Sequence, residues 1–202
     1  MFLTRMALDQ NRQETRELLG DMGQMQRVVR AAFAGGNMQP LFRTDLISSR
    51  LWLVILSRLR PSLAATHEAY GYPGVFPSWE TFDYDETLEQ ASEGTAWHFE
   101  LTASPMGIQP DPDPVWLEAY TLNRWLERQG EACGYELREA RMLQSVWKQV
   151  GDACLLLACW DGLITIRDQE KFIWAVSGGI GSGRDLGAGL MTIAKAHTFW
   201  ES

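Results

Sequence analysis

Cysteine, histidine and lysine are all scarce in this chain of 202 residues, with three of each. The cysteines, Cys133, Cys154 and Cys159, form no CxxC pair, which argues against structural zinc and against a disulfide framework. No apolar run approaches the roughly 18 residues of a membrane span. The first residues, MFLTRMALDQ, lack the apolar centre of a signal peptide. These absences predict a cytoplasmic protein with reduced thiols, no membrane partner and no metal site.

Negative charge predominates, with a net charge of -8, but it is unevenly distributed. Residues 1–60 carry nine arginines against five acidic residues, whereas residues 61–136 carry two arginines against fourteen acidic residues. A net negative charge argues against indiscriminate binding of nucleic acid. The basic first third and the acidic middle could mark different faces of the protein, or they could be solvated charge without a partner.

The alternation of strand and helix patterns predicts the order β-α-β-β-α-β in the first half of the chain and strands and helices in a ferredoxin-like order again in the second half. Asp21, followed by Gln24, predicts the start of a helix that continues through Phe33, and Asp168 predicts the start of another over 169–177. The alternation over 97–101 is assigned to the last strand of the first half, and 135–143 with 145–150 to a hairpin. We therefore expect an α+β fold of two tandem ferredoxin-like (RRM-like) domains with antiparallel sheets, spanning 1–108 and 109–202.

A glycine-rich stretch, GGIGSGRDLGAG over 178–189, has six glycines in twelve residues. It lacks the Lys-Ser/Thr of a phosphate-binding P-loop, and it follows a helix and precedes a strand, the reverse of a dinucleotide fingerprint. Backbone conformation alone explains two or three of the glycines. Glycines together with Arg184 form a suitable backbone cradle for phosphate groups, without sequence readout.

The spacing of these glycines resembles a known motif. Gly179-Ile180-Gly181, five residues, then Gly187-Ala188-Gly189 is similar to the C-terminal glycine-rich motif of the CRISPR repeat-RNA endoribonucleases, in particular the subtype I-E form, CasE. The stretches that resemble this family's first strand, mid-region and ending are MFLTRMALD, PSWETFDYDETLEQASEGTAWHFELTASP and FIWAVSGGIGSGRDLGAGLMTIA. The resemblance therefore extends over nearly the whole chain.

The resemblance implies a fold and an activity. The family has two ferredoxin-like domains, binds the hairpin in each CRISPR repeat and cuts the RNA without metal or cofactor. In that reaction the 2′-hydroxyl attacks the adjacent phosphorus and leaves a 2′,3′-cyclic phosphate. The enzyme then stays on the hairpin as a subunit of the Cascade surveillance complex. The glycine stretch would lie on the RNA backbone, with Arg184 where the family usually has lysine.

The family's catalytic histidine is missing at the matching position. The family carries a Met-His pair on its first helix, often with a tyrosine one turn earlier, whereas this chain has Met25-Gln26 and Gly23. A glutamine amide does not titrate near neutral pH and cannot act as a general base. Of the three histidines, His67 and His98 fit structural or surface roles, and His197, after the last strand, is a weak candidate for a relocated acid or base.

Further residues are candidates for RNA contact, although a solvated surface explains each of them as well. Arg27 and Arg30 share the polar side of the first predicted helix, and Arg138, Arg141 and Lys148 lie on predicted strands that could contact an A-form groove. The candidates in the glycine stretch are Gly179, Gly181, Ser182, Gly183, Arg184 and Gly187. The periodicity around Trp97, Trp160 and Trp174 predicts that these tryptophans lie in the core.

Three functional hypotheses follow. The chain is a hairpin-binding Cascade subunit whose own cleavage is weak or lost, its binding partners being the CRISPR RNA repeat hairpin and the other Cascade proteins. It could instead be an active endoribonuclease that uses a relocated acid or base, His197 or a tyrosine. It could also be an acidic scaffold subunit that no longer binds RNA. No cofactor is expected in any of the three.

Overall fold

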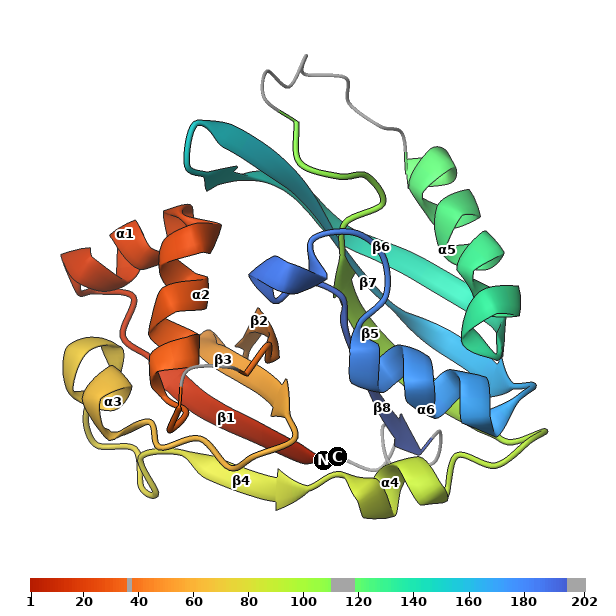
Figure 1. Cartoon of the computed structure of the whole chain (residues 1–202), viewed down its shortest axis with the longest axis horizontal. Helices are drawn as coiled ribbons and strands as arrows, with labels where there is room; N and C mark the ends of the chain where they lie inside the picture. The colour runs from red at the N-terminus through yellow and green to blue at the C-terminus, as the bar shows by residue number, and fades with distance from the viewer. Residues whose placement is uncertain (36–37, 110–118, 196–202) are drawn as a thin grey trace.

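The computed structural model describes residues 1–35, 38–109 and 119–195 and contains two four-stranded antiparallel sheets (Figure 1). The first sheet has the order β2 (Leu41–Ile47), β3 (Arg50–Ser57), β1 (Phe2–Leu8) and β4 (Glu80–Asp83). The second has the order β6 (Tyr135–Val150), β7 (Ala153–Ile166), β5 (Ala96–Ala103) and β8 (Leu190–Lys195). In both sheets the first strand in sequence lies between the third and the fourth, which is the ferredoxin-like arrangement, so the predicted fold class is confirmed.

The helices occupy the positions that this arrangement requires. The first half contains α1 (Gln13–Gly20), α2 (Met22–Ala31) and α3 (Ala64–Tyr70), and the short α4 (Asp85–Glu89) follows β4. The second half contains α5 (Ala119–Cys133), α6 (Gln169–Gly178) and a 3-10 turn, η1 (Arg184–Leu186). Figure 1 shows α5 and α6 on the side of the second sheet that faces away from the first half.

The sequence signals for the helix starts are confirmed. The Asp21 carboxylate accepts the Gln24 backbone N–H at 2.9 Å, and the Asp168 carboxylate accepts that of Lys171 at 3.0 Å. Each bond satisfies one of the backbone donors that a helix start leaves without a partner. The preceding helix, α1, was not predicted.

Two strand assignments are wrong. Residues 96–103, expected to complete the first half, form the first strand of the second sheet, and the short β4 completes the first sheet instead. The chain thus passes between the sheets within 84–95, and the expected boundary at 108/109 does not coincide with this division. Residues 135–150 form one long strand rather than a hairpin, with register shifts at Leu137/Glu139 and Met142/Gln144, and they pair with β7.

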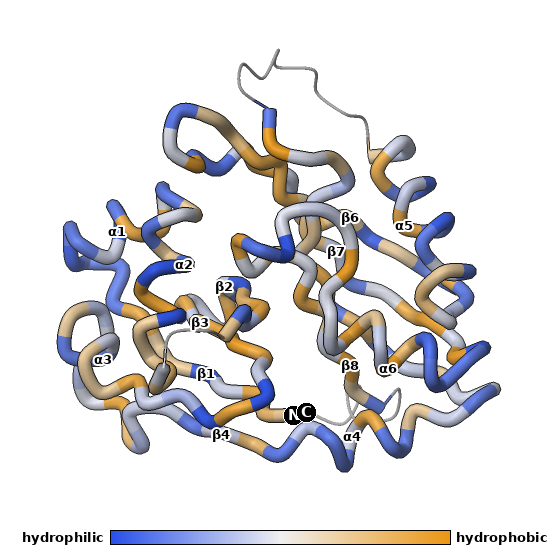
Figure 2. Tube along the Cα trace, in the orientation of Figure 1, coloured by the Kyte–Doolittle hydropathy of each residue, from blue (hydrophilic) through white to orange (hydrophobic). Residues whose placement is uncertain are grey.

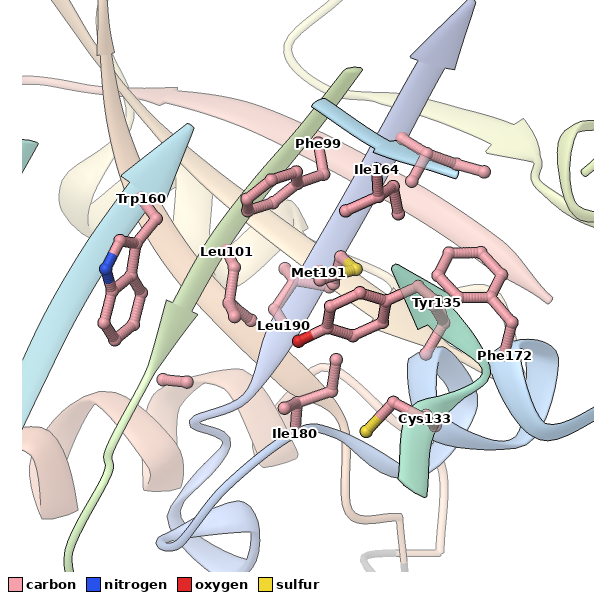
Figure 3. Close-up of a cluster of buried hydrophobic side chains, with 14 of the residues drawn as sticks. Phe99, Leu101, Cys133, Tyr135, Trp160, Ile164, Phe172, Ile180, Leu190 and Met191 are labelled. Atoms are coloured by element: carbon pink, nitrogen blue, oxygen red, sulfur yellow. The ribbon is translucent and has the colours of Figure 1, made fainter. Parts of the chain in front are cut away.

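Hydrophobic strand residues form two packed clusters, each of which contains residues from both halves of the chain. Figure 2 shows the hydrophobic residues concentrated along the strands and the hydrophilic residues on the outer surfaces of the helices. The cluster in Figure 3 belongs to the second half, where Phe99, Trp160 and Phe172 are almost fully buried. Leu41, Val54 and Leu56 of the first half extend the same cluster.

Arg43 of β2 joins the two sheets through hydrogen bonds. Its side chain is 3% exposed and forms ion pairs with Asp45 at 2.7 Å and with Glu100 of β5 at 2.6 Å. The guanidinium also donates to the Glu100 carbonyl and to the Thr192 hydroxyl of β8. The buried cation is therefore paired and hydrogen-bonded, as a buried charge must be.

Candidate nucleic-acid interface

The glycine stretch forms a loop between α6 and β8 that needs glycine for its own conformation. Five of its six glycines have positive φ angles, from 76° to 95°, and lie at positions 179, 181, 183, 187 and 189. A Cβ atom at any of these five positions would come within 3.0 Å of another atom of the protein. The expectation that conformation explains only two or three of the glycines is therefore wrong, because the close neighbour of this backbone is the rest of the same chain.

The glycine loop packs against both halves. A Cβ at Gly187 would overlap the Phe42 ring of β2, and the Gly187 carbonyl accepts the Phe42 backbone N–H at 2.8 Å. At Gly181 a Cβ would lie 2.6 Å from the Ser104 carbonyl oxygen and 3.1 Å from the Trp125 ring of α5. Ile180 points into the cluster of the second half (Figure 3), whereas Leu186 packs into the other cluster. The loop therefore holds the two halves together.

Only part of the loop is accessible. Gly179 and Gly187 are buried, Gly181, Ser182 and Gly183 are partly exposed, and Arg184 is exposed. Of the residues proposed from the sequence to meet RNA, Gly179 and Gly187 therefore serve the packing of the loop. The parts that a ligand could contact are therefore Gly178 and the segment Gly181–Asp185, which includes the exposed acidic side chain of Asp185.

Gln26 lies next to this loop. It projects from α2, and its side-chain amide donates a hydrogen bond to the backbone carbonyl of Asp185 in η1. The structure thus brings together two regions that lie 159 residues apart in the sequence. An amide held in this way can position a neighbouring group, but it cannot transfer a proton.

The two arginines of α2 differ in exposure. Arg27 is exposed, and its guanidinium lies 3.7 Å from the point that a Cβ at Gly23 would occupy, so it extends back over Gly23. Arg30 is partly buried. Arg27 is therefore the arginine of α2 that a ligand near the start of this helix could contact.

The three basic residues predicted on strands do not form one cluster. Arg138 pairs with Glu136 at 2.9 Å, and Arg141 binds both oxygens of Asp161, at 3.1 and 2.5 Å. Lys148 donates to the Leu19 carbonyl at 2.6 Å, and burial lowers its pKa. Ten residues of strand separate Arg138 from Lys148, about 33 Å, so these cations cannot act together at one phosphate.

A cleft of about 170 Å³ separates α1 and α2 from strands β5–β7. Its lining is largely apolar, and the ionisable residues that line it are Asp21, Arg43, Lys148 and Cys159. Asp21 caps α2, Arg43 is paired, and Lys148 contacts Leu19. The cleft therefore supplies no pair of groups suited to general acid–base catalysis.

The uneven charge of the sequence is partly neutralised within the structure. Glu80 pairs with Arg5 at 2.6 Å, and Glu100 pairs with Arg43. Asp85 pairs with the N-terminal amino group. The acidic middle of the chain therefore supplies partners to the basic first third, which weakens the interpretation of either segment as a separate charged face.

The histidines and the metal-ligating residues add no further site among the residues that the structure describes. His98 lies four residues before Thr102 on β5, about 13 Å along the strand from the end that contacts the glycine loop. His67 lies on α3, and His197 lies outside the described residues. Within 1–35, 38–109 and 119–195, no three His, Cys, Asp or Glu residues form a group that could hold a metal ion.

The sequence also placed a tryptophan incorrectly. Trp97 and Trp160 are buried as predicted, but Trp174 of α6 is 70% exposed. Phe172, Ala175 and Val176 form the buried face of this helix, so Trp174 lies on the opposite face. In the part of the chain that is described, no helix combines the length and the hydropathy needed to cross a membrane.

Comparison with known proteins gives a family and a fold. Residues 1–195 match the model of a family described as CRISPR associated protein. Thermus thermophilus Cse3, bound to an RNA that represents a pre-cleavage complex, is 22% identical with a TM-score of 0.75, over 96% of this chain and 98% of that one. Escherichia coli Cas6e is 16% identical, with a TM-score of 0.64 over 96% and 100%. A chain of E. coli Cascade bound to target DNA is 15% identical, with a TM-score of 0.54 over 96% and 99%. No curated protein matches the sequence.

Proposed function

This chain belongs to the CRISPR-associated protein family, and from that premise we propose that it is a CasE-type subunit that binds the hairpin of a CRISPR repeat and has little or no cleavage activity of its own. The fold is shared with Cse3 bound to RNA and with a chain of Cascade. The subunit would remain on the processed RNA within a Cascade-like complex with other protein subunits. Its three cysteines are free, as expected in the reducing cytoplasm, where we place it.

The observation that carries this proposal is the contact between Gln26 and the glycine loop. By the resemblance to the family, Gln26 takes the place of the family's histidine, and its side-chain amide donates a hydrogen bond to the Asp185 carbonyl. Arg27 and Arg184, which neighbour Gln26 and Asp185 in the chain, are both exposed and could bind phosphate. The arrangement therefore keeps groups that bind an RNA backbone while it lacks a group that titrates near neutral pH. Loss of proton transfer lowers a rate by roughly 10²–10⁴-fold.

The test is a single-turnover cleavage assay in EDTA, with protein in excess over an end-labelled repeat RNA. The wild-type protein should shift the RNA in a gel without cutting it, and the variant Gln26→His should cut it at the 3′ base of the hairpin. Gln24→His, on the same helix and two residues away, is the matched control and should not cut. A product that ends in a 2′,3′-cyclic phosphate would identify attack by the 2′-hydroxyl.

The same assay separates the other hypotheses. Cleavage by the wild-type protein at a rate that Gln26→His does not raise would show that an acid or base elsewhere, such as His197 or a tyrosine, performs the reaction. Tyr84 and Tyr135 are poor candidates, because burial raises the pKa of both phenols far above neutral pH. Absence of any salt-sensitive binding to the hairpin would favour a scaffold without RNA.

A further inference from the structure

A groove that contains two arginines lies along α5, next to the glycine loop. It has a volume of about 440 Å³ and lies between α5 and the segment after β5. One wall is formed by Pro105 and Met106, and the other by Tyr120, Arg124 and Arg128. The sequence analysis assigned none of these five residues to contact with RNA.

Tyr120, Arg124 and Arg128 form a single row on the helix. Residues four apart lie on the same face, and each step advances about 6 Å along the axis. Tyr120 is 67% exposed, and the Arg124 guanidinium lies 5.9 Å from the centre of its ring. Two positive charges thus follow an exposed aromatic ring at even spacing, an arrangement that suits consecutive phosphates and one base.

The two arginines of this row are available to a ligand. Both are exposed, and neither forms an ion pair with any residue that the structure describes, although Glu127 and Glu131 lie on the same helix. In this they differ from Arg138 and Arg141, which are held by carboxylates. A bound phosphate would therefore not have to displace a carboxylate of any residue that the structure describes.

The groove is continuous with the accessible part of the glycine loop. Trp125, which also lines the groove, has its ring 3.1 Å from the position of a Cβ at Gly181. The Ser182 backbone N–H donates to the Ser104 carbonyl at 2.8 Å, and the next residue, Pro105, belongs to the groove wall. Trp125 is itself held by stacking on Trp160 at a centroid distance of 5.7 Å. An RNA strand that lies across Gly181–Arg184 would therefore continue directly into this groove.

We propose that the groove along α5 binds single-stranded RNA that flanks the hairpin, with Arg124 and Arg128 on consecutive phosphates and the Tyr120 ring stacked on a base. This inference rests on the proposed hairpin-binding function. A single row of charges matches one strand rather than the two backbones of a duplex. Stacking on an aromatic side chain requires a base that is free of its neighbours, as in single-stranded RNA.

The experiment measures the affinity of the full-length protein for three RNAs: the hairpin alone, the hairpin with a six-nucleotide 5′ tail, and the hairpin with a six-nucleotide 3′ tail. The variants are Arg124→Ala/Arg128→Ala and Tyr120→Ala. The matched control is Arg50→Ala/Arg58→Ala, which removes two exposed arginines of the first half, one of which stacks on Tyr72 at 5.1 Å. Thermal melts confirm that each variant is folded.

The wild-type protein should bind one tailed RNA more tightly than the bare hairpin, and the arginine variant should lose that gain while still binding the bare hairpin normally. Its salt slope on the tailed RNA should fall by about 1.4, since each contact with a single strand contributes roughly 0.7. Tyr120→Ala should weaken binding of the tailed RNA roughly tenfold. The control should match wild type throughout.

Equal affinity and equal salt slope for wild type and both variants on every RNA would overturn the inference. So would a loss of binding to other complex subunits with RNA affinity unchanged, which would assign the groove to a protein. If the wild-type protein fails to bind even the bare hairpin, the proposed function itself fails, and this result is distinct from a failure confined to the tails.

Discussion

Arg43 is the residue on which the junction of the two sheets depends most directly. Its side chain is almost fully buried, yet each of its contacts is polar and well placed. A buried ion pair adds little net stability compared with apolar residues, but removal of one partner leaves the other charge without compensation. The value of Arg43 therefore lies in orienting β2 against β5 and β8.

We expect Arg43→Met to lower the free energy of unfolding by about 3 kcal/mol. This is the lower end of the usual range, because the Glu100 side chain that loses its partner is 45% exposed and can regain water. Urea denaturation measures the change. Arg58→Met, at an exposed position, is the control and should stay within about 0.5 kcal/mol of wild type. A loss equal to that of the control would show that the ion pairs do not hold the sheets.

Tyr84 provides a pH-dependent test of the same junction. Its hydroxyl accepts the Ile193 backbone N–H of β8 at 2.7 Å, and burial raises its pKa to about 12. Because the pKa is higher in the folded state, the stabilisation is complete below the unfolded value near 10 and is lost as the pH rises through 12. Between pH 9 and pH 11 wild type should lose about 1 kcal/mol more stability than Tyr84→Phe. Parallel curves for the two proteins would contradict this assignment.

The structural roles of some single residues could be predicted from the sequence, and those of others could not. Asp21 and Asp168 were predicted to cap helices because capping depends on residues only three positions away. The partners of Arg43 lie up to 149 residues away, and nothing local indicates them. Trp174 was misplaced because an apolar run such as FIWAV does not indicate by its periodicity which residues face the core.

The glycine loop is the element whose interpretation changes most. Its glycines suggest closeness to a ligand, but the structure shows that closeness to Phe42, Ser104 and Leu155 already requires them. The sequence identified the loop correctly as a site of close approach and could not identify what approaches. Only the exposed and partly exposed residues of the loop, Gly178 and Gly181–Asp185, could contact a ligand, and the assignment of that ligand to RNA stays a prediction.

Two glycine substitutions within this stretch test whether the packing of the loop is what requires glycine. Gly187→Ala places a Cβ into the Phe42 ring at a φ of 91°, and we expect it to cost roughly 2–4 kcal/mol from backbone strain and overpacking. Gly178→Ala meets no atom within 4 Å and should leave stability unchanged or raise it by up to about 1 kcal/mol. Thermal and urea unfolding give both values. Similar effects for the two variants would show that the packing of the loop is not what requires glycine.

The strands show a similar contrast between local and distant information. β2 and β3 pair with each other across a turn of only two residues, Ser48 and Ser49, so this pairing depends on local sequence. The placement of β5 was wrong, because β4 is only four residues long and follows an aromatic loop with prolines, so the next clear alternation was taken for the fourth strand. Which sheet a strand joins depends on long-range pairing, here between β5 and both β7 and β8.

Several independent kinds of contact join the two halves into one structural unit. Both hydrophobic clusters contain residues from both sheets, and the glycine loop contributes to each of them. Charges of the first third pair with charges of the middle, and Lys148 near the end of β6 contacts the last turn of α1. Two folded RNA-binding domains on a flexible linker would show none of these contacts. The RNA surface we propose, from α2 across the loop to α5, therefore depends on both halves being folded.

This coupling predicts that the protein unfolds in a single step. Hydrogen exchange followed by mass spectrometry reports separately on peptides from β3 and from β7, the central strands of the two sheets. If the halves are coupled, the slowest amides in both peptides exchange only through global unfolding and give the same free energy of opening. Arg43→Met should then lower both values by the same amount. A variant that lowers protection in β3 and leaves β7 unchanged would show that the halves unfold independently, and the continuous RNA surface would need a different explanation.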